Sequence, residues 1–200
     1  MKNGVRKKIK LDEIYASKAN PRTGQGGAVV NEGLAESMKE TGRQVKALSF
    51  LQPWAQCVLD LGKRTENRPR VTHHRGPVVL HISKGWDKTG EKFIWENWEK
   101  IKRRGDASDP RAFLYYAARR RGGFGGVFEI KDCWQPAPAG PRDIWTFGPY
   151  CYSIEVMGSL PEIIPAKGQL GFWNVPGDME IKIMVALGLF KIPENVEVKP

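Results

Sequence analysis

The first signal in the hydrophobic pattern is a helical repeat that follows Pro53. Trp54, Val58 and Leu61 lie on one face of such a helix, because side chains three or four residues apart are neighbours on a helix surface. Pro53 suits the first helical position, where its missing N–H costs nothing, and Gly62 suits the residue just beyond the end. The pattern predicts a short helix from Pro53 to Leu61.

A period of two replaces the helical period farther along the chain. Val78, Leu80 and Ile82 occupy alternate positions, which is typical of a half-buried strand. The segment between the helix and this strand is rich in charge and is interpreted as a loop. Residues 48–84 therefore predict the order strand, helix, charged loop, strand.

Beyond this unit the pattern predicts further helices and strands. Asp87 or Thr89 can cap a helix in which Trp95 and Trp98 serve as packing residues, and Asp109-Pro110 begins another helix. Short strands, glycine corners and intervening helices favour an α+β fold, built as a small mixed β-barrel with helices outside it. The other predicted elements are strands at 127–133 and 150–156, a closing strand pair at 163–165 and 170–173, and a helix at 178–187.

The length of 200 residues allows one well-buried domain with an appendage. We expect an accessory arm at 1–46, a β-barrel domain at 47–176, and a C-terminal helix and tail at 177–200. The apolar runs are too short to span a membrane, and the start of the chain resembles no signal region, so we expect a cytoplasmic protein without a membrane partner. Three isolated cysteines predict reduced thiols, and neither a cofactor nor a metal site is indicated.

The formal charge of +10 and the pI near 9.6 favour a polyanionic partner, most simply nucleic acid. Two basic clusters are candidates for phosphate contacts, one with Arg103 and Arg104 and the other with Arg119 and Arg120. Cations at the end of a helix also interact favourably with its dipole, and both interpretations can hold together. Lys63, Glu66 and Arg68 form a third charged group, for which an ordinary solvated surface is the alternative.

An ordered set of motifs resembles the ASCH family, which belongs to the PUA-like superfamily of small β-barrels. The motifs cover about residues 47–175, and the set is more specific than any one of them. Gly62 and Lys63 are adjacent here, whereas the family usually has one residue between them. The motifs are Gln52-Pro53-Trp54, Lys63-x-x-Glu66-Asn67-Arg68, His74-Arg75-Gly76-Pro77, His81-Ile82-Ser83-Lys84, Phe147-Gly148-Pro149-Tyr150 and Lys167-Gly168-Gln169-Leu170-Gly171-Phe172-Trp173.

The resemblance implies a ligand cleft at the barrel mouth, between the first helix and the charged loop. Single-stranded RNA is commonly read by aromatic stacking and by hydrogen bonds to base edges. Trp145 is the better stacking candidate, whereas the helical phase of Trp54 favours the core, and Trp173 is expected in the core. Asn67 is a candidate for reading a base edge. The candidate binding residues are Gln52, Trp54, Lys63, Glu66, Asn67, Arg68, Arg75, His81, Ser83, Lys84, Trp145, Arg103, Arg104, Arg119 and Arg120.

These residues support a nucleic-acid-binding protein that recognises RNA or another single-stranded or modified nucleic acid in a basic cleft. An alternative is an amidohydrolase that deacylates N4-acetylcytidine, since Lys63, Thr65 and Glu66 match the residue types of similar small enzymes. That chemistry requires a neutral lysine, which is rare at pH 7 in water. A second alternative is metal-independent RNA cleavage with His81 as the base, although a strand histidine is more often a hydrogen-bonded pocket residue.

The accessory arm carries a resemblance of its own. Residues 8–45 are similar to the opening of ParB-like domains, with an Asn20-Pro21-Arg22 turn before a helix that contains Leu34-Ala35-Glu36-Ser37. A lone strand and helix cannot bury a core. The arm is therefore expected to pack on the barrel or to remain mobile, not to act as a separate nucleotide-binding or nuclease module.

Overall fold

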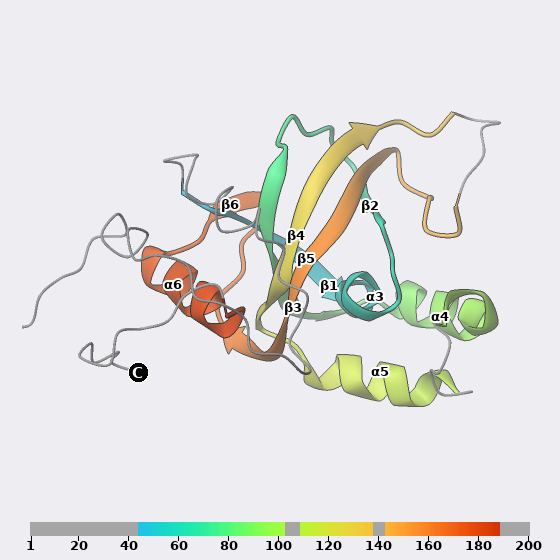
Figure 1. Cartoon of the computed structure of the whole chain (residues 1–200). Helices are drawn as coiled ribbons and strands as arrows, with labels where there is room; N and C mark the ends of the chain where they lie inside the picture. The colour runs from blue at the N-terminus through green and yellow to red at the C-terminus, as the bar shows by residue number, and fades with distance from the viewer. Residues whose placement is uncertain (1–43, 103–108, 138–142, 189–200) are drawn as a thin grey trace, which may run out of the picture.

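The structure is a computed structural model that describes residues 44–102, 109–137 and 143–188. These residues form six strands and four helices, and the strands make one curved sheet (Figure 1). Nearly all of the predicted N-terminal arm, including its ParB-like motif, lies outside the described residues, as do Arg103 and Arg104. The elements are β1 (Lys46–Gln52), α3 (Trp54–Asp60), β2 (Thr65–Arg68), β3 (Gly76–Trp86), α4 (Lys88–Ile101), α5 (Pro110–Arg119), β4 (Gly123–Trp134), β5 (Tyr150–Pro165), β6 (Phe172–Asn174) and α6 (Gly177–Ala186).

The sheet is mixed, with the strand order β2-β5-β4-β3-β1-β6. The β1 and β3 strands are parallel, because α3 and β2 lie between them in the chain and return it to the same end of the sheet. The remaining ladders, β1 with β6, β2 with β5, β3 with β4 and β4 with β5, are antiparallel. The α+β class predicted from the sequence is therefore confirmed, and the mixed character of the sheet is confirmed with it.

Alternation along β3 divides the core into two sides, as the sequence predicted. Leu80 and its alternate neighbours pack with α3, whereas Val79 packs with α6 on the other face. Ile183 and Leu187, in and just beyond α6, are 0% and 5% exposed, which confirms the predicted C-terminal helix and makes it part of the core. Glu180 of α6 also accepts a hydrogen bond from Val45 N at 3.0 Å, so this helix anchors the start of β1.

A third cluster joins α3, α4 and α5. Trp98 is 5% exposed and packs in this cluster, as predicted, but Trp95 is 44% exposed, so the packing role predicted for Trp95 is wrong. Asp87 caps α4 by accepting hydrogen bonds from Thr89 N and Gly90 N, and Asp109 caps α5 in the same way. The end of α3 also follows the prediction, since Gly62 has a φ of +70° directly after the helix.

Two predicted segments fold differently. The charged stretch expected as a loop contains strand β2, which pairs with residues 150–153 of β5. Thr, Glu, Asn and Arg carry little strand signal, so tertiary pairing overrides local propensity here. The predicted closing pair does not form either, because residues 164 and 165 belong to β5 and pair with β4, whereas β6 pairs with β1.

Within the described part of the chain the sheet is open, with β2 and β6 as its edges, so the expected closed barrel is not confirmed. The sheet is nevertheless curved enough for Arg68 on β2 to donate a hydrogen bond to Ser49 O on β1 at 2.9 Å. Tyr152 of β5 stacks with Phe172 of β6, 6.5 Å between ring centroids. No helix in the described ranges has both the length and the apolar character needed to cross a membrane.

Candidate functional site

A pocket of about 320 Å³ opens between β1, the first turn of α3 and β2. Two cations, Lys63 and Arg68, and two carboxylates, Glu66 and Asp87, line it, so its lining is formally neutral. This corrects the expectation of a basic cleft. The complete lining is Ser49, Phe50, Leu51, Trp54, Lys63, Glu66, Asn67, Arg68, Pro69, Asp87 and Phe147.

A row of three charged side chains forms the floor of the pocket. Lys63 Nζ lies 2.6 Å from Glu66 Oε2, and Arg68 Nε lies 2.9 Å from Glu66 Oε1. The second contact is close in distance but is not aligned as a hydrogen bond, because Arg68 Nε lacks a hydrogen-bond partner of good geometry. Lys63 is 1% exposed and Glu66 7%. The three charged side chains singled out in the sequence therefore lie together in the structure.

Backbone pairing and packing hold this row in place. Residues 65–68 pair with β5, which fixes the side on which Glu66 projects. The guanidinium of Arg68 lies 4.9 Å from the ring centroid of Phe50, and the ammonium of Lys63 lies 6.0 Å from that of Trp54. Lys63 Nζ also donates a hydrogen bond to Thr65 O. Each of the two cations therefore sits between the carboxylate of Glu66 and an aromatic ring, which compensates for its removal from water.

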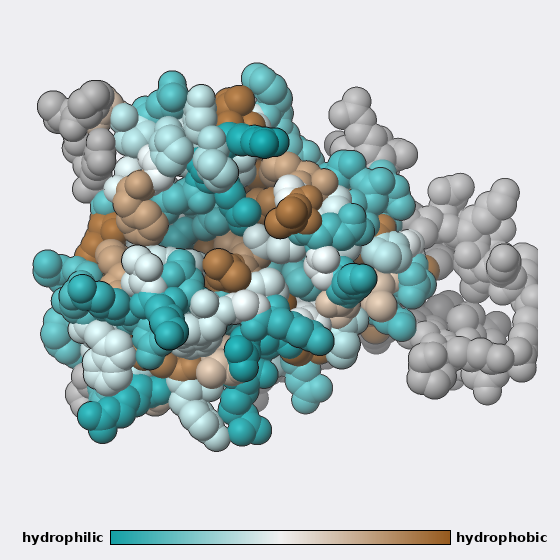
Figure 2. Space-filling model, turned by 180° about the vertical axis from the view of Figure 1, so that it is seen from behind, coloured by the Kyte–Doolittle hydropathy of each residue, from teal (hydrophilic) through white to brown (hydrophobic). Residues whose placement is uncertain are grey.

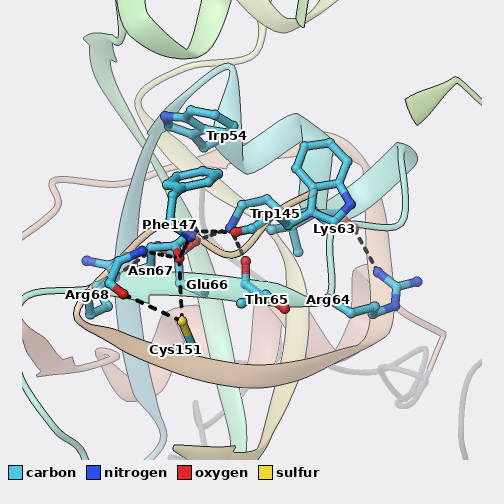
Figure 3. A network of polar contacts seen from close by, with 12 residues as sticks. Trp54, Lys63, Arg64, Thr65, Glu66, Asn67, Arg68, Trp145, Phe147 and Cys151 are labelled. Carbon is cyan, nitrogen blue, oxygen red and sulfur yellow. Dashed lines mark hydrogen bonds and ion pairs between the residues drawn. The ribbon is translucent and has the colours of Figure 1, made fainter. Parts of the chain in front are cut away.

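Two aromatic side chains form the opposite wall. The rings of Trp54 and Phe147 lie 5.3 Å apart between centroids, and Figure 3 shows them on the same side of β2. Phe147 is 50% exposed and Trp54 is partly exposed. Trp54 Nε1 donates to Asp87 Oδ2 at 2.8 Å, so the residue that caps α4 also fixes this indole. Trp54 thus lines the pocket and also packs against the buried cluster of α3, α4 and α5, as its helical phase predicted.

The side chain of Asn67 holds the loop that carries Phe147. Its Oδ1 accepts hydrogen bonds from Phe147 N at 3.0 Å and Gly148 N at 2.8 Å, and its Nδ2 donates to Trp145 O at 2.8 Å. A Cβ atom on Gly148 would lie 2.7 Å from Asn67 Cβ, so the fit requires glycine at this position. Asn67 therefore positions the aromatic wall, in place of the predicted contact with a base edge.

Trp145 does not provide the predicted stacking face. It is 6% exposed and packs in the cluster of α3, α4 and α5, next to Phe93 at 5.5 Å between centroids. In Figure 3 its ring lies apart from those of Trp54 and Phe147. The Pro- and Gly-rich neighbourhood suggested an exposed loop, but the loop turns Trp145 inward and Phe147 outward. Trp173 is 6% exposed, as predicted for a core residue.

The groups expected to act in catalysis are arranged differently from the hypothesis. Thr65 Oγ1 donates to Asp143 Oδ2 at 3.1 Å, whereas Lys63 contacts the carbonyl oxygen of Thr65 and not its hydroxyl. Thr65 is 6% exposed and does not line the pocket. The structure therefore brings Lys63 and Glu66 together but does not present the threonine hydroxyl to the lysine.

His81 lies outside the pocket and is 2% exposed. Its Nδ1 lies 3.1 Å from Ser49 Oγ and its Nε2 3.2 Å from Ala166 O, and its ring packs edge-on against Phe124 and Trp173. Burial lowers the pKa of His81, and the contact with the Ala166 carbonyl opposes this shift. The residue ties β3 to the segment before β6, which is a structural role.

Gln52 and Arg120 are also structural. The side chain of Gln52 is 0% exposed and donates to Arg120 O at 2.8 Å, while its oxygen accepts from Gln56 N. Arg120 is 9% exposed and donates to Leu160 O at 2.7 Å. These bonds join the end of β1, the end of α5 and the middle of β5. Neither residue lines the pocket.

The remaining predicted binding residues lie on the surface, away from the pocket lining. Arg75 pairs with Asp132 at 2.9 Å, and Ser83 Oγ accepts from Gly85 N. Lys84 and Arg119 are exposed. The structure thus brings Trp54, Lys63, Glu66, Asn67 and Arg68 together around one pocket and places these other residues elsewhere.

Of the six lining residues that sequence reasoning missed, Phe147 and Asp87 are the two that build and fix the aromatic wall. A signal existed for both, since Phe147 begins the Phe-Gly-Pro-Tyr motif and Asp87 was predicted as a possible helix cap. Their pocket roles depend on contacts with residues 33 positions away for Asp87 and 80 positions away for Phe147, which the local pattern does not reveal. The sequence matches no known family model, and no curated protein shows significant similarity to it.

Proposed function

We propose that the chain is an ASCH-type nucleic-acid-binding protein of the PUA-like class, and that the pocket receives one base of RNA or of another single-stranded nucleic acid. The observation that carries this proposal is the pairing of an aromatic wall, Trp54 and Phe147, with a fixed row of hydrogen-bonding groups, Lys63, Glu66 and Arg68. Unpaired bases are held in this way, by stacking on a ring and by bonds to the base edge.

The size of the pocket suits such a ligand. About 320 Å³ lies at the low end of the range for small-molecule sites, which is roughly 300–1,000 Å³. A single base with part of its sugar therefore fills it better than a larger cofactor does. The rest of the strand remains outside, where the exposed half of Phe147 is within reach.

The charge balance points to a base edge and not to a phosphate. Glu66 faces both cations of the floor, and Asp87 supplies the second negative charge of the lining, so the pocket as a whole carries no net charge. The carboxylate retains acceptor capacity, and the guanidinium and ammonium are donors only. A base edge that carries both a donor and an acceptor matches this row, whereas a phosphate would be repelled by the carboxylates.

The fold supports the assignment to a barrel-like class. Arg68 spans the gap between edge strand β2 and strand β1, which are not neighbours in the sheet order. Residues of β1, β3, β4 and β5 share one interior with α3. The motifs that resemble the ASCH family, Gln52-Pro53-Trp54 and Lys63-x-x-Glu66-x-Arg68, meet at the place where α3 covers this interior.

The test is the binding of a labelled single-stranded RNA of about four nucleotides, followed by fluorescence anisotropy. Phe147→Ala removes an exposed ring, so the variant keeps its fold and should weaken binding by about 1–3 kcal/mol, the value of one stacked base. Trp54→Ala should have a similar or larger effect.

Leu170→Ala is the control, since Leu170 is 99% exposed and does not line the pocket. The control should bind the RNA as the parent protein does. Equal affinity of the parent, Phe147→Ala and Trp54→Ala for the oligonucleotide would overturn the proposal.

A further inference from the structure

The outer face of α5 carries a second arrangement of arginine and aromatic residues. Arg111, Tyr115 and Arg119 are spaced by four residues, so they form one stripe along the helix, and all three are exposed. The opposite face of α5 is occupied, because Leu114 and Ala117 are buried. Tyr115 is 65% exposed, more than any other aromatic side chain in the described ranges.

The end of this stripe continues onto the neighbouring turn and strand. Arg121 Nη1 donates to Lys84 O at 3.3 Å, and the side chain of Lys84 lies against Gly122, where an added Cβ would be 3.2 Å from Lys84 Cε. Arg119, Arg121 and Lys84 are all exposed. Arg121 and Lys84 therefore lie together where α5 ends beside β3, and Arg119 lies two residues before Arg121 in the chain.

These three cations have no acidic partner in the described part of the chain. Arg119 donates to Tyr115 Oη at 3.0 Å and lies 5.5 Å from the centroid of its ring. The cations elsewhere on the stripe differ, since Arg111 pairs with Asp109 at 3.3 Å. Residues 110–121 contain four arginines and no acidic residue. Among the described residues, the charge at the end of α5 is therefore uncompensated.

The dipole of α5 favours a cation such as Arg119 in the last turn through space, without a direct bond. A side chain can in addition cap a helix end by bonding to its last carbonyl groups. The bonds of Arg119 and Arg121 go instead to the Tyr115 hydroxyl and to Lys84 O. Arg120, between them, turns inward to Leu160 O. The outward pair is thus held with its charge toward solvent.

We propose that this surface, defined as Lys84, Tyr115, Arg119 and Arg121, binds the sugar-phosphate backbone of a single-stranded nucleic acid, with a base stacked on Tyr115. Arginines beside an exposed ring offer both a phosphate contact and a stacking face, the combination used for single strands. The inference extends the proposed function and rests on the same class of ligand. On the face shown in Figure 2, hydrophobic residues stand in small groups among hydrophilic ones, with no broad apolar area.

The experiment measures anisotropy of a labelled oligouridylate of about 20 nucleotides across a series of salt concentrations. Each phosphate contact to a single strand contributes about 0.7 to the slope of log affinity against log salt. Arg119→Gln combined with Arg121→Gln should reduce that slope by about 1.4. Tyr115→Leu keeps both charges, so it should weaken binding while leaving the slope unchanged.

The matched control is Lys131→Gln combined with Lys182→Gln, which removes the same charge from β4 and α6. This control should keep the slope of the parent protein. An equal loss of slope in both double variants would reduce the effect to net charge and overturn the inference. A second result would also overturn the inference: tight binding of polyglutamate by the parent protein that is lost in the α5 double variant. That result would assign the surface to an acidic protein partner.

The experiments distinguish failure of the pocket proposal from failure of the α5-surface proposal. Loss of tetranucleotide binding in Phe147→Ala together with a normal salt slope in the α5 double variant would retain the pocket and reject the α5 surface. A reduced slope in the α5 double variant, with normal binding in Phe147→Ala, would retain the surface and reject the pocket.

Discussion

Two arginine-bearing regions of this molecule differ in how the protein treats their charge. In the pocket, Arg68 faces Glu66 and is packed on Phe50, and Lys63 is compensated in the same way. At the end of α5, Arg119 is supported by the ring and hydroxyl of Tyr115. The first region is largely buried and lies in a pocket whose lining has no net charge, whereas the second is exposed and positively charged.

This contrast assigns different physical tasks to the two regions. A neutral row of donors and acceptors discriminates among base edges, and its binding depends little on salt because few counterions are released. An uncompensated cationic surface attracts any strand, and its binding weakens steeply as salt rises. Net charge alone could not separate these tasks, since it counts both regions together.

The largest effect on stability should come from breaking the row of Lys63, Glu66 and Arg68 in the pocket floor. Glu66→Gln leaves Lys63, which is 1% exposed, without its counter-charge. Removing one partner of a buried ion pair costs about 3–5 kcal/mol, so the free energy of unfolding in urea should fall by that amount. Glu129→Gln is the control, because Glu129 pairs with Lys131 at the surface and should cost less than about 1 kcal/mol. A similar loss of unfolding free energy in Glu66→Gln and Glu129→Gln would contradict the claim that Glu66 belongs to a buried ion-pair network.

A smaller effect should follow from releasing the loop that carries Phe147. Asn67→Ala leaves the backbone N–H groups of Phe147 and Gly148 without their acceptor. The free energy of unfolding should fall by about 1–3 kcal/mol, and affinity for the tetranucleotide should fall with it. Asn97→Ala removes one local hydrogen bond on α4 and serves as the control. Unchanged affinity in Asn67→Ala would show that the loop needs no such anchor.

Acid should weaken the fold through His81, on the sheet face away from the pocket. Its folded-state pKa is lowered by burial, so below the ordinary value of 6.5 the unfolded chain binds more protons than the native one. Stability should fall as pH drops from 6.5, by at most about 1.4 kcal/mol per pH unit for this group. The free energy of unfolding in urea should be measured between pH 7 and 5.5 for the parent protein and for His81→Gln. The difference between the two pH profiles is the contribution of His81.

The pKa values of His74 and Glu180 are also shifted, and the comparison with His81→Gln removes their effect. Burial also lowers the pKa of His74, which adds to the acid loss. The pKa of Glu180 is raised by burial, so its contribution to stability is present at low pH and declines as pH rises through the folded value. Identical pH profiles for the parent protein and His81→Gln would contradict the assignment.

The smallest effect on stability is expected at α5. Arg119 is exposed and bonds only to Tyr115 among the described residues, so Arg119→Gln should change the free energy of unfolding by less than about 0.5 kcal/mol. The same variant should weaken oligouridylate binding. A large loss of stability would show that Arg119 is a structural residue like Arg120.

The sequence predicted the parts of the fold that depend on local rules. A few neighbouring residues are enough to predict each of three features: the helix cap at Asp87, the glycine after α3 and the alternation in β3. Strand β2 was missed because its residues have low strand propensity, and pairing with β5 alone makes it a strand. The open edges of the sheet depend on long-range pairing and were missed for the same reason.

The candidate site was predicted in its charges but not in its aromatic wall. Lys63, Glu66 and Arg68 lie close together in the chain, and alternation along an edge strand brings 66 and 68 to one face. The choice between Trp145 and Phe147 depended on which way a Pro- and Gly-rich loop turns. That direction is set by three hydrogen bonds from Asn67, about eighty residues earlier in the chain.

The most direct measurement for the pocket is a photo-crosslinking map with a single-stranded RNA that carries photoreactive uridines, read by mass spectrometry of the peptides. The account predicts that short RNA attaches to the peptides containing Trp54 and Phe147, and that longer RNA adds the peptide containing Tyr115. Crosslinks confined to α6, with none at Trp54 or Phe147, would contradict a base-binding pocket between α3 and β2.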